Sequence, residues 1–365
     1  MNIEELSPSL VDSLDPSVEI NITLEDSQTL SHAIIQLLDR PNPFESLQNN
    51  PAEKEHLDQL LKVVVERFEG PANPDMAFEL HKSLNTIYDY QINAFAKAPQ
   101  YDPTLMEVMA KLESAWLAFE KKRMPQEDIP TEPKAFSKWL KQYVLKHPSS
   151  NHPLFQYLAD ESKKEEMSYF FSQEVTIDPR FDDLIALMQV GIKTPGIKME
   201  LASNFWDEMG NGVPEDVHTE LFSRLYSELD IYRDGETFAD VLERASWQAL
   251  ACGNTLLYSV LHRKNLNIGL GALGTVEIIS PFRFSHLVRG FKRLGLSDEA
   301  SEYHQTHISI DARHGNGWLT NAIRPTVAQS VEAREEVFFG SMLRMNTSMD
   351  YCEHMAKTFA LDINK

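Results

Sequence analysis

Three side chains of the kind that bind transition metals stand close together in the segment 307–314, HISIDARH. His307, Asp311 and His314 are separated by intervals of four and three residues. On an α-helix those intervals place all three side chains on one face. Two imidazoles and one carboxylate form part of the ligand set of a transition-metal site. The segment therefore predicts a metal site completed by residues from elsewhere, although a solvated helix face would show the same spacing.

A second group of candidate ligands lies in the segment 208–218. Glu215 and His218 are three residues apart, a spacing that brings both side chains to one face if they share a helix. Di-iron helical bundles use such E-x-x-H pairs as ligands. Glu208 stands before an interruption by two glycines and a proline. A kink there would bring Glu208 toward His218, whereas a solvated carboxylate is the alternative.

Two further carboxylates stand in apolar surroundings. Glu174 follows an aromatic run at 169–171, and Glu277 is the only charged residue between Lys264 and Arg283. A buried carboxylate needs a partner, which is a metal, a basic group or a proton. The sequence therefore predicts both as ligands, with an ion pair or protonation as the alternatives for Glu277.

The candidate ligands together comprise three histidines and five carboxylates: His218, His307, His314, Glu174, Glu208, Glu215, Glu277 and Asp311. Zinc sites rarely gather so many carboxylates, whereas a pair of hard, redox-active metals does. The set therefore favours a non-haem di-iron centre. His304 precedes His307 by three residues, and we expect it at the surface, with a hydrogen bond to a ligand as the alternative.

The composition excludes several classes of protein. Among 365 residues there are 55 acidic and 34 basic ones, a formal net charge of −21 that argues against nucleic acids and anionic membranes as partners. The two cysteines form no CxxC pair, which excludes zinc fingers, iron–sulfur clusters and a disulfide framework. The first residues lack the pattern of a signal peptide, and no apolar run is long enough to span a membrane. We therefore expect a cytoplasmic protein.

Hydrophobic residues recur with helical periodicity along most of the chain, and strand-like alternation is nearly absent, which predicts an all-α fold. The proline-rich, charged segment 125–134 predicts a linker between two domains. We expect an N-terminal helical domain over 1–130, serving packing or dimerisation, and a helix bundle over 131–365. Helices expected within the bundle include 152–176, 214–229, 237–262, and 269–279, the last ended by Pro281.

Over about 150–325, these motifs resemble the haem-oxygenase-like di-iron oxidases, also called iron-containing redox enzymes. The resemblance rests on FFSQE at 170–174, NFWDEMGNG with PEDVH within 204–218, GALGTVE at 271–277 and HxxxDxxH at 307–314. It implies a haem-oxygenase-like seven-helix bundle with six main iron ligands: Glu174, His218, Glu277, His307, Asp311 and His314. It also implies that Glu208 is the extra carboxylate of an N-oxygenating branch. Glu215 would be a shifting ligand or a hydrogen-bond partner of one.

The same resemblance implies two iron ions, O2 as co-substrate, an external electron donor, a small-molecule substrate and a homodimer. The expected reaction is N-oxygenation of an amine or an amino-acid-derived molecule in a biosynthetic pathway. Oxidative cleavage of a C–C bond in an amino or fatty acid is the alternative on the same centre. A metal-free helical binding or scaffold protein is the alternative of another class. Three basic residues near the motifs are candidates for holding a substrate carboxylate, with surface ion pairs as the alternative: Lys198, Arg283 and Arg313.

Overall fold

The computed structural model describes residues 27–233 and 235–361, and every regular element in these two ranges is helical. The predicted all-α fold is therefore confirmed for this part of the chain. The N-terminal segment, in which we expected no signal peptide, falls within residues 1–26 and lies outside the described residues. None of the described helices is long and apolar enough to cross a membrane.

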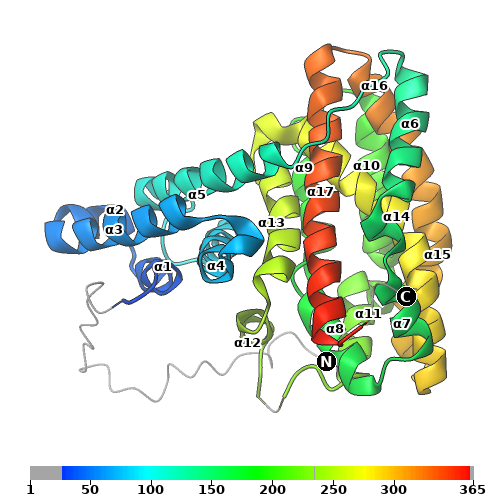
Figure 1. Ribbon diagram of the computed structural model, residues 1–365, viewed down its shortest axis with the longest axis horizontal. Helices are drawn as coiled ribbons and strands as arrows, with labels where there is room; N and C mark the ends of the chain where they lie inside the picture. The colour runs from blue at the N-terminus through cyan, green and yellow to red at the C-terminus, as the bar shows by residue number, and fades with distance from the viewer. Residues whose placement is uncertain (1–26, 234, 362–365) are drawn as a thin grey trace.

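The first five α-helices form an arm that projects from one side of the molecule (Figure 1). They are α1 (Leu30–Leu38), α2 (Pro43–Gln48), α3 (Pro51–Arg67), α4 (Pro74–Ile92) and α5 (Pro103–Lys122). The helices α2 to α5 each begin with an Asn or Asp whose side chain accepts a backbone N–H, followed directly by a proline. Such a cap satisfies a free helix N–H, and proline at the first helical position sacrifices no hydrogen bond.

The remaining α-helices form a bundle in which α14 is the most heavily packed element, lying against α15 and α17. They are α6 (Pro133–Lys146), α7 (Pro153–Asp160), α8 (Lys164–Glu174), α9 (Phe181–Gln189), α10 (Pro195–Glu208), α11 (His218–Glu228), α12 (Phe238–Glu243), α13 (Trp247–Leu261), α14 (Leu266–Leu294), α15 (Asp298–Gly317), α16 (Arg324–Val327) and α17 (Val331–Thr358). A π-helix at Trp318–Ile323 joins α15 to α16.

The arm meets the bundle through α4 and α13. Lys82 of α4 is almost fully buried there and lies 2.6 Å from a carboxylate oxygen of Glu243. The side-chain amide of Asn85 donates to that of Asn254 at 3.1 Å. The predicted linker falls between α5 and α6, where the described chain has no helix from 124 to 132. The domain boundary itself stays a prediction.

Several predicted helices are divided in the structure. The expected helix 152–176 is α7 and α8, because Glu166 accepts the backbone N–H of Lys163 and starts a new helix there. The expected helix 237–262 is α12 and α13, since Ser246 caps α13 by accepting the N–H of Ala249. Local capping thus overrides a continuous apolar pattern.

Pro281 does not end its helix, contrary to the prediction, and α14 runs through it to Leu294. Proline has no N–H, so the carbonyl of Glu277, four residues earlier, loses its helical donor. Burial of α14 against α15 and α17 outweighs that loss. The α15 helix comes close to this carbonyl at Gly315, where an added Cβ would lie 3.0 Å from the Glu277 oxygen. Glycine therefore permits the close approach of the two helices.

Candidate metal centre

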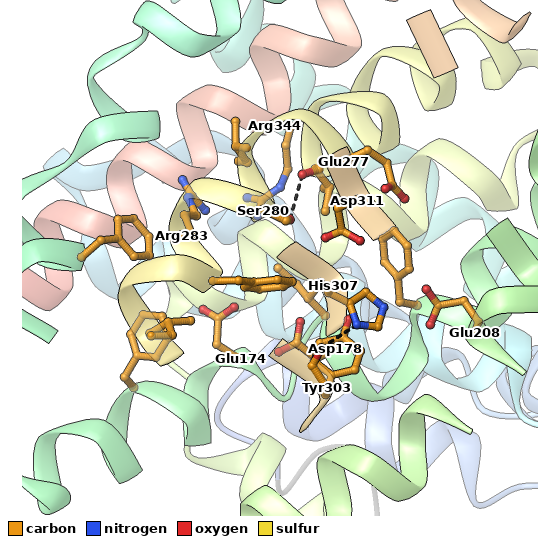
Figure 2. A pocket seen from close by; sticks show the side chains of 18 residues that line it. Glu174, Asp178, Glu208, Glu277, Ser280, Arg283, Tyr303, His307, Asp311 and Arg344 are labelled. Carbon is orange, nitrogen blue, oxygen red and sulfur yellow. Dashed lines mark hydrogen bonds between the residues drawn. The ribbon is translucent and has the colours of Figure 1, made fainter. Parts of the chain in front are cut away.

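A cavity of about 50 Å³ lies inside the bundle and is lined by residues of α7, α8, α9, α10, α14, α15 and α17 and of the segment between α8 and α9. Figure 2 shows its polar side chains, which are Glu174, Asp178, Glu208, Glu277, Ser280, Arg283, Tyr303, His307, Asp311 and Arg344. Apolar side chains complete the wall, including Phe155, Phe170 and Phe284. The cavity therefore combines groups that can bind metals with a lining that limits water.

Glu208, His218 and His307 form one group of buried ligand atoms, which we call cluster A; the three atoms lie within 4.8 Å of one another. The Nδ1 of His218 is hydrogen-bonded to Oε2 of Glu208. His307 donates from Nδ1 to the backbone carbonyl of Tyr303 at 2.7 Å, and its buried Nε2 has no hydrogen-bond partner. That bond leaves the lone pair on Nε2, which is the form in which imidazole binds a metal.

The turn between α10 and α11 brings Glu208 to His218. The α10 helix ends at Glu208, and a 3-10 turn at Gly210–Gly212 reverses the chain before α11 begins at His218. Gly210 has φ +56°, and an added Cβ would lie 2.5 Å from the carbonyl carbon of Asp216. Only glycine fits this position, so the interruption seen in the sequence does produce the predicted approach.

Glu215 lies outside both clusters, contrary to the prediction. It stands in a separate 3-10 turn, and Val217, with φ −59° and ψ 133°, separates it from α11. The α11 helix therefore does not include Glu215, and the E-x-x-H spacing does not bring Glu215 and His218 to one helix face. The side chain of Glu215 is exposed. Its backbone carbonyl accepts from Arg224 instead.

Glu277, Asp311 and His314 form a second group of buried ligand atoms, cluster B, also within 4.8 Å of one another. Glu277 comes from α14, and the other two come from α15, where the intervals predicted a shared face. The Nδ1 of His314 lies 3.8 Å from Oε2 of Glu277, and that oxygen has no hydrogen-bond partner. An unpaired carboxylate oxygen beside an unpaired imidazole nitrogen leaves a position for a cation.

Asp207 holds the imidazole of His314 in place, a role that the sequence did not reveal. Its Oδ2 accepts from Nε2 of His314 at 2.8 Å and from Arg313 at 2.6 Å. The other oxygen, Oδ1, accepts from Asn211 at 3.1 Å. Because the proton sits on Nε2, Nδ1 keeps its lone pair on the side of cluster B.

Burial and mutual repulsion disfavour ionised carboxylates in the metal-free cavity. Burial raises the pKa of Glu277 well above its usual range, and Asp311 and Glu208 raise it further. Burial and Glu208 likewise raise the pKa of Asp311. Burial and the neighbouring His218 hold the pKa of His307 well below its usual range. Divalent cations would stabilise these carboxylates and use the neutral imidazoles, so the two clusters fit a pair of metal ions.

Glu174 and Asp178 line the cavity but belong to neither cluster. Tyr351 is hydrogen-bonded to Glu174, and burial raises the pKa of this carboxyl. Asp178, which sequence analysis missed, follows the end of α8; burial and Glu174 raise its pKa well above its usual range. The only signal in the sequence was the interval of four residues from Glu174, which is common by chance.

His304 is fully buried, so the prediction of a surface position was wrong. Its ring packs against Phe284 and Phe171, with centroid distances of 4.8 and 5.2 Å. Neither ring nitrogen has a hydrogen-bond partner, which also rules out the alternative of a bond to a ligand. Burial lowers the pKa of His304 to about 3, and the ring acts as part of the aromatic core.

The three basic residues that we considered for substrate binding lie in different places. Arg283 lines the cavity. The side chain of Arg313 is mostly exposed and pairs with Asp207, and Lys198 is exposed on α10. Arg344 of α17 also lines the cavity, but nothing in its local sequence distinguished it.

The match to a family of known proteins covers the part of the chain that carries both clusters. Residues 168–349 match the model of a family described as iron-containing redox enzymes. Among curated proteins, the 4-chloro-allylglycine synthase of Streptantibioticus cattleyicolor is 26% identical over 199 residues, covering 53% of this chain and 74% of that protein. Among solved structures, a CADD-like protein of unknown function from Nostoc punctiforme PCC 73102 matches with a TM-score of 0.49 and 16% identity, covering 60% of this chain and 95% of that one.

Proposed function

Because the chain belongs to the iron-containing redox enzyme family, we propose that clusters A and B each hold one iron ion and that the protein uses O2 to oxygenate an amine nitrogen of a small molecule. Family membership confirms the expected haem-oxygenase-like bundle and an iron-dependent oxidative function. The unpaired buried atoms His307 Nε2 and Glu277 Oε2 support metal binding at both clusters.

The position of Glu208 carries the proposal of N-oxygenation. Its carboxylate lies in cluster A together with His218 and His307, and it adds one negative charge to the six ligands that the family resemblance implies. More negative charge on the metals would slow hydrogen abstraction from carbon and so leave time for reaction with a nucleophilic nitrogen. Two bound irons would supply the binding and reduction of O2.

The cavity residues would prepare the substrate for this reaction. An amine attacks only as the neutral base, so its ammonium form must first lose a proton. Burial and the charge of Glu174 raise the pKa of Asp178, which makes this carboxylate a stronger base than an exposed one, and it would accept that proton. The rings of Phe155, Phe170 and Phe284 line the cavity and restrict water. An external electron donor and a homodimer remain proposals, tested by reduction with candidate donors and by light scattering.

Oxidative C–C cleavage is the second candidate. The 26% identical relative is named as a synthase of an allyl-substituted glycine, that is, of an amino acid carrying an alkene. Cleavage of a C–C bond after hydrogen abstraction can leave an alkene, so this name supports cleavage as the second candidate here. The same cavity would serve it if hydrogen abstraction outpaced attack at nitrogen.

The first experiment counts the irons. The chelated protein is loaded with Fe(II) without O2, desalted and analysed for iron. We expect about two irons per chain, and fewer in His307→Ala and His314→Ala. His286→Ala, on α14 but outside the cavity lining, is the matched control and should bind as the wild type does. Iron content in the wild type no higher than in the two cluster variants would favour the metal-free scaffold protein.

The second experiment identifies the reaction. The loaded protein is mixed with O2 and a panel of amines and amino acids, and products are identified by mass spectrometry. N-hydroxylated or nitro products are expected, and Glu208→Ala should lose them while cluster B still binds iron. An alkene, an aldehyde or a one-carbon fragment as the only product would establish C–C cleavage instead.

A further inference from the structure

Two arginines from different helices stand at one end of the cavity. Arg283 of α14 and Arg344 of α17 both line it, and Figure 2 shows them on the side away from Glu208. Neither has a carboxylate within ion-pair distance among the described residues. Arg344 is buried and Arg283 is half-buried, whereas Arg180, the other buried arginine of the described chain, ion-pairs with Asp89 at 2.9 Å.

Arg283 is held by neutral groups. One Nη donates to the backbone carbonyl of Ser149 at 2.9 Å and to the hydroxyl of Ser348 at 2.6 Å. Its guanidinium lies over the ring of Phe155, 4.7 Å from the centroid, and its buried Nε has no partner. These contacts fix the orientation of the guanidinium without neutralising its charge.

Arg344 is only 5% exposed and is likewise held by a neutral group. Its Nη1 donates to Sγ of Cys252 at 3.3 Å, and its buried Nε has no partner. Burial and the nearby charge of Arg344 lower the pKa of Arg283. Two neighbouring like charges, one buried and one half-buried, are costly without an ion-pair partner, and an anion bound by both would offset that cost.

Glu174 offsets the two positive charges only in part. Burial raises its pKa, while a hydrogen bond from Tyr351 and the charges of Arg344 and Arg283 act to lower it, yet its carboxylate lies beyond ion-pair distance from both guanidiniums. A carboxylate in direct contact with the two guanidiniums would complete the pairing.

We propose that Arg283 and Arg344 together bind a carboxylate of the substrate, so that the substrate is an amino acid whose amine faces clusters A and B. Guanidinium groups bind carboxylates and phosphates through paired hydrogen bonds, and the small cavity favours the smaller carboxylate. The placement of the amine toward clusters A and B rests on the proposed function, whereas the binding of the carboxylate by the two arginines does not.

Isothermal titration calorimetry on the Fe(II)-loaded protein without O2 tests this directly. The probes are amino acids paired with the amines that lack the carboxylate: L-lysine with cadaverine, L-arginine with agmatine, and L-leucine with isopentylamine. L-Alanine and 1-aminoethylphosphonate compare a carboxylate with a phosphonate. We expect at least one acid to bind at least tenfold more tightly than its amine, and alanine more tightly than its phosphonate.

Variants assign the binding to the two arginines. Arg344→Gln and Arg283→Gln should each remove the preference for the acid, and Arg344→Lys should retain part of it. Arg293→Gln, on the same helix as Arg283 but bonded to backbone carbonyls of 158–162, is the matched control. If Arg283→Gln fails to fold by circular dichroism, Arg344→Gln decides the question.

The outcomes separate this proposal from the proposed function. Equal binding of acids and amines, no binding by any acid, or unchanged preference in Arg344→Gln would overturn the carboxylate site. Tighter binding of the phosphonate would overturn the choice of carboxylate. N-oxygenation of an amine that lacks an acid group would overturn the amino-acid substrate and leave the proposed function intact. Selective binding of acids followed only by C–C cleavage would overturn N-oxygenation and leave the carboxylate site intact.

Discussion

Replacing Glu277 by glutamine should stabilise the metal-free protein, and by more as the pH rises. The carboxyl is 4% exposed, and burial followed by the charges of Asp311 and Glu208 raises its pKa well above the usual 4.5. Between pH 4.5 and the raised value, the folded protein holds a proton that the unfolded chain has lost. The contribution of the Glu277 carboxyl to stability is therefore fully present below pH 4.5, and it is lost as the pH rises through this window. Glutamine removes the titration and keeps the shape.

The size of the effect follows from the number of protons. One proton held only by the folded state costs about 1.4 kcal/mol of stability for each pH unit. The advantage of Glu277→Gln should therefore be small near pH 4.5 and grow by about that amount per unit, until the pH passes the folded pKa of the wild type. With iron bound the sign reverses, because the variant lacks a ligand of cluster B.

Buried histidines produce an opposite trend that cancels in this comparison. Burial lowers the pKa of His81 and His304 to about 3, so the unfolded chain takes up their protons first as the pH falls below 6.5. Their contribution to stability is present above pH 6.5 and lost as the pH falls toward 3. Both proteins carry these histidines, so the difference between variant and wild type isolates Glu277.

Urea unfolding of the chelated proteins at pH 5, 6, 7 and 8, followed by circular dichroism, measures the difference. Glu335→Gln, at an exposed carboxylate on α17, is the matched control, and its stability should follow that of the wild type at all four pH values. A constant difference between Glu277→Gln and wild type over this range would refute the reasoning. So would a difference that shrinks as the pH rises.

Three further results follow from contacts around the centre. Asp207→Asn should weaken iron binding by about 10–100-fold at cluster B, since a neutral amide replaces the charged carboxylate that accepts from the imidazole there, and competition with a chelator measures this. Gly315→Ala should destabilise the metal-free protein by about 1–3 kcal/mol in thermal unfolding, because its Cβ meets the carbonyl of Glu277; an unchanged melting temperature would contradict the close helix approach. Arg123→Ala should cost about 1–3 kcal/mol in urea unfolding by leaving Asp350 without its 2.7 Å partner, and no loss would show that water replaces it.

Local spacing predicted the parts of the site that lie on one helix. His307, Asp311 and His314 share a face of α15 because the interval of 3.6 residues holds within one regular helix. Glu277 was recognisable because a lone charge in an apolar helix must have a partner. The prediction of Glu215 as a ligand was wrong because it also relied on helical spacing. The interval from Glu215 to His218 places both side chains on one face only if one helix includes both residues.

The residues that sequence analysis missed depend on contacts between distant elements. Asp207 and Arg344 reach the site through the packing of α10 and α17, and no local pattern distinguishes either from a surface residue. Asp178 follows the end of α8 and reaches the cavity through the fold of the chain beyond that helix. Pro281 misled the helix prediction because tertiary burial outweighs the loss of one hydrogen bond.

The two metal positions differ in how their ligands are anchored. Cluster B is built from two long helices that are consecutive in the sequence and in close contact at Gly315. Cluster A instead depends on the exposed turn 209–217, which carries Glu208 on one side and His218 on the other. Insertions, deletions or substitutions in that turn would alter cluster A directly and would reach cluster B only through the hydrogen bond from Asn211 to Asp207. Evolution or design that keeps Asn211 can therefore retune the geometry and metal preference of cluster A with little effect on cluster B, for example toward a mixed-metal centre.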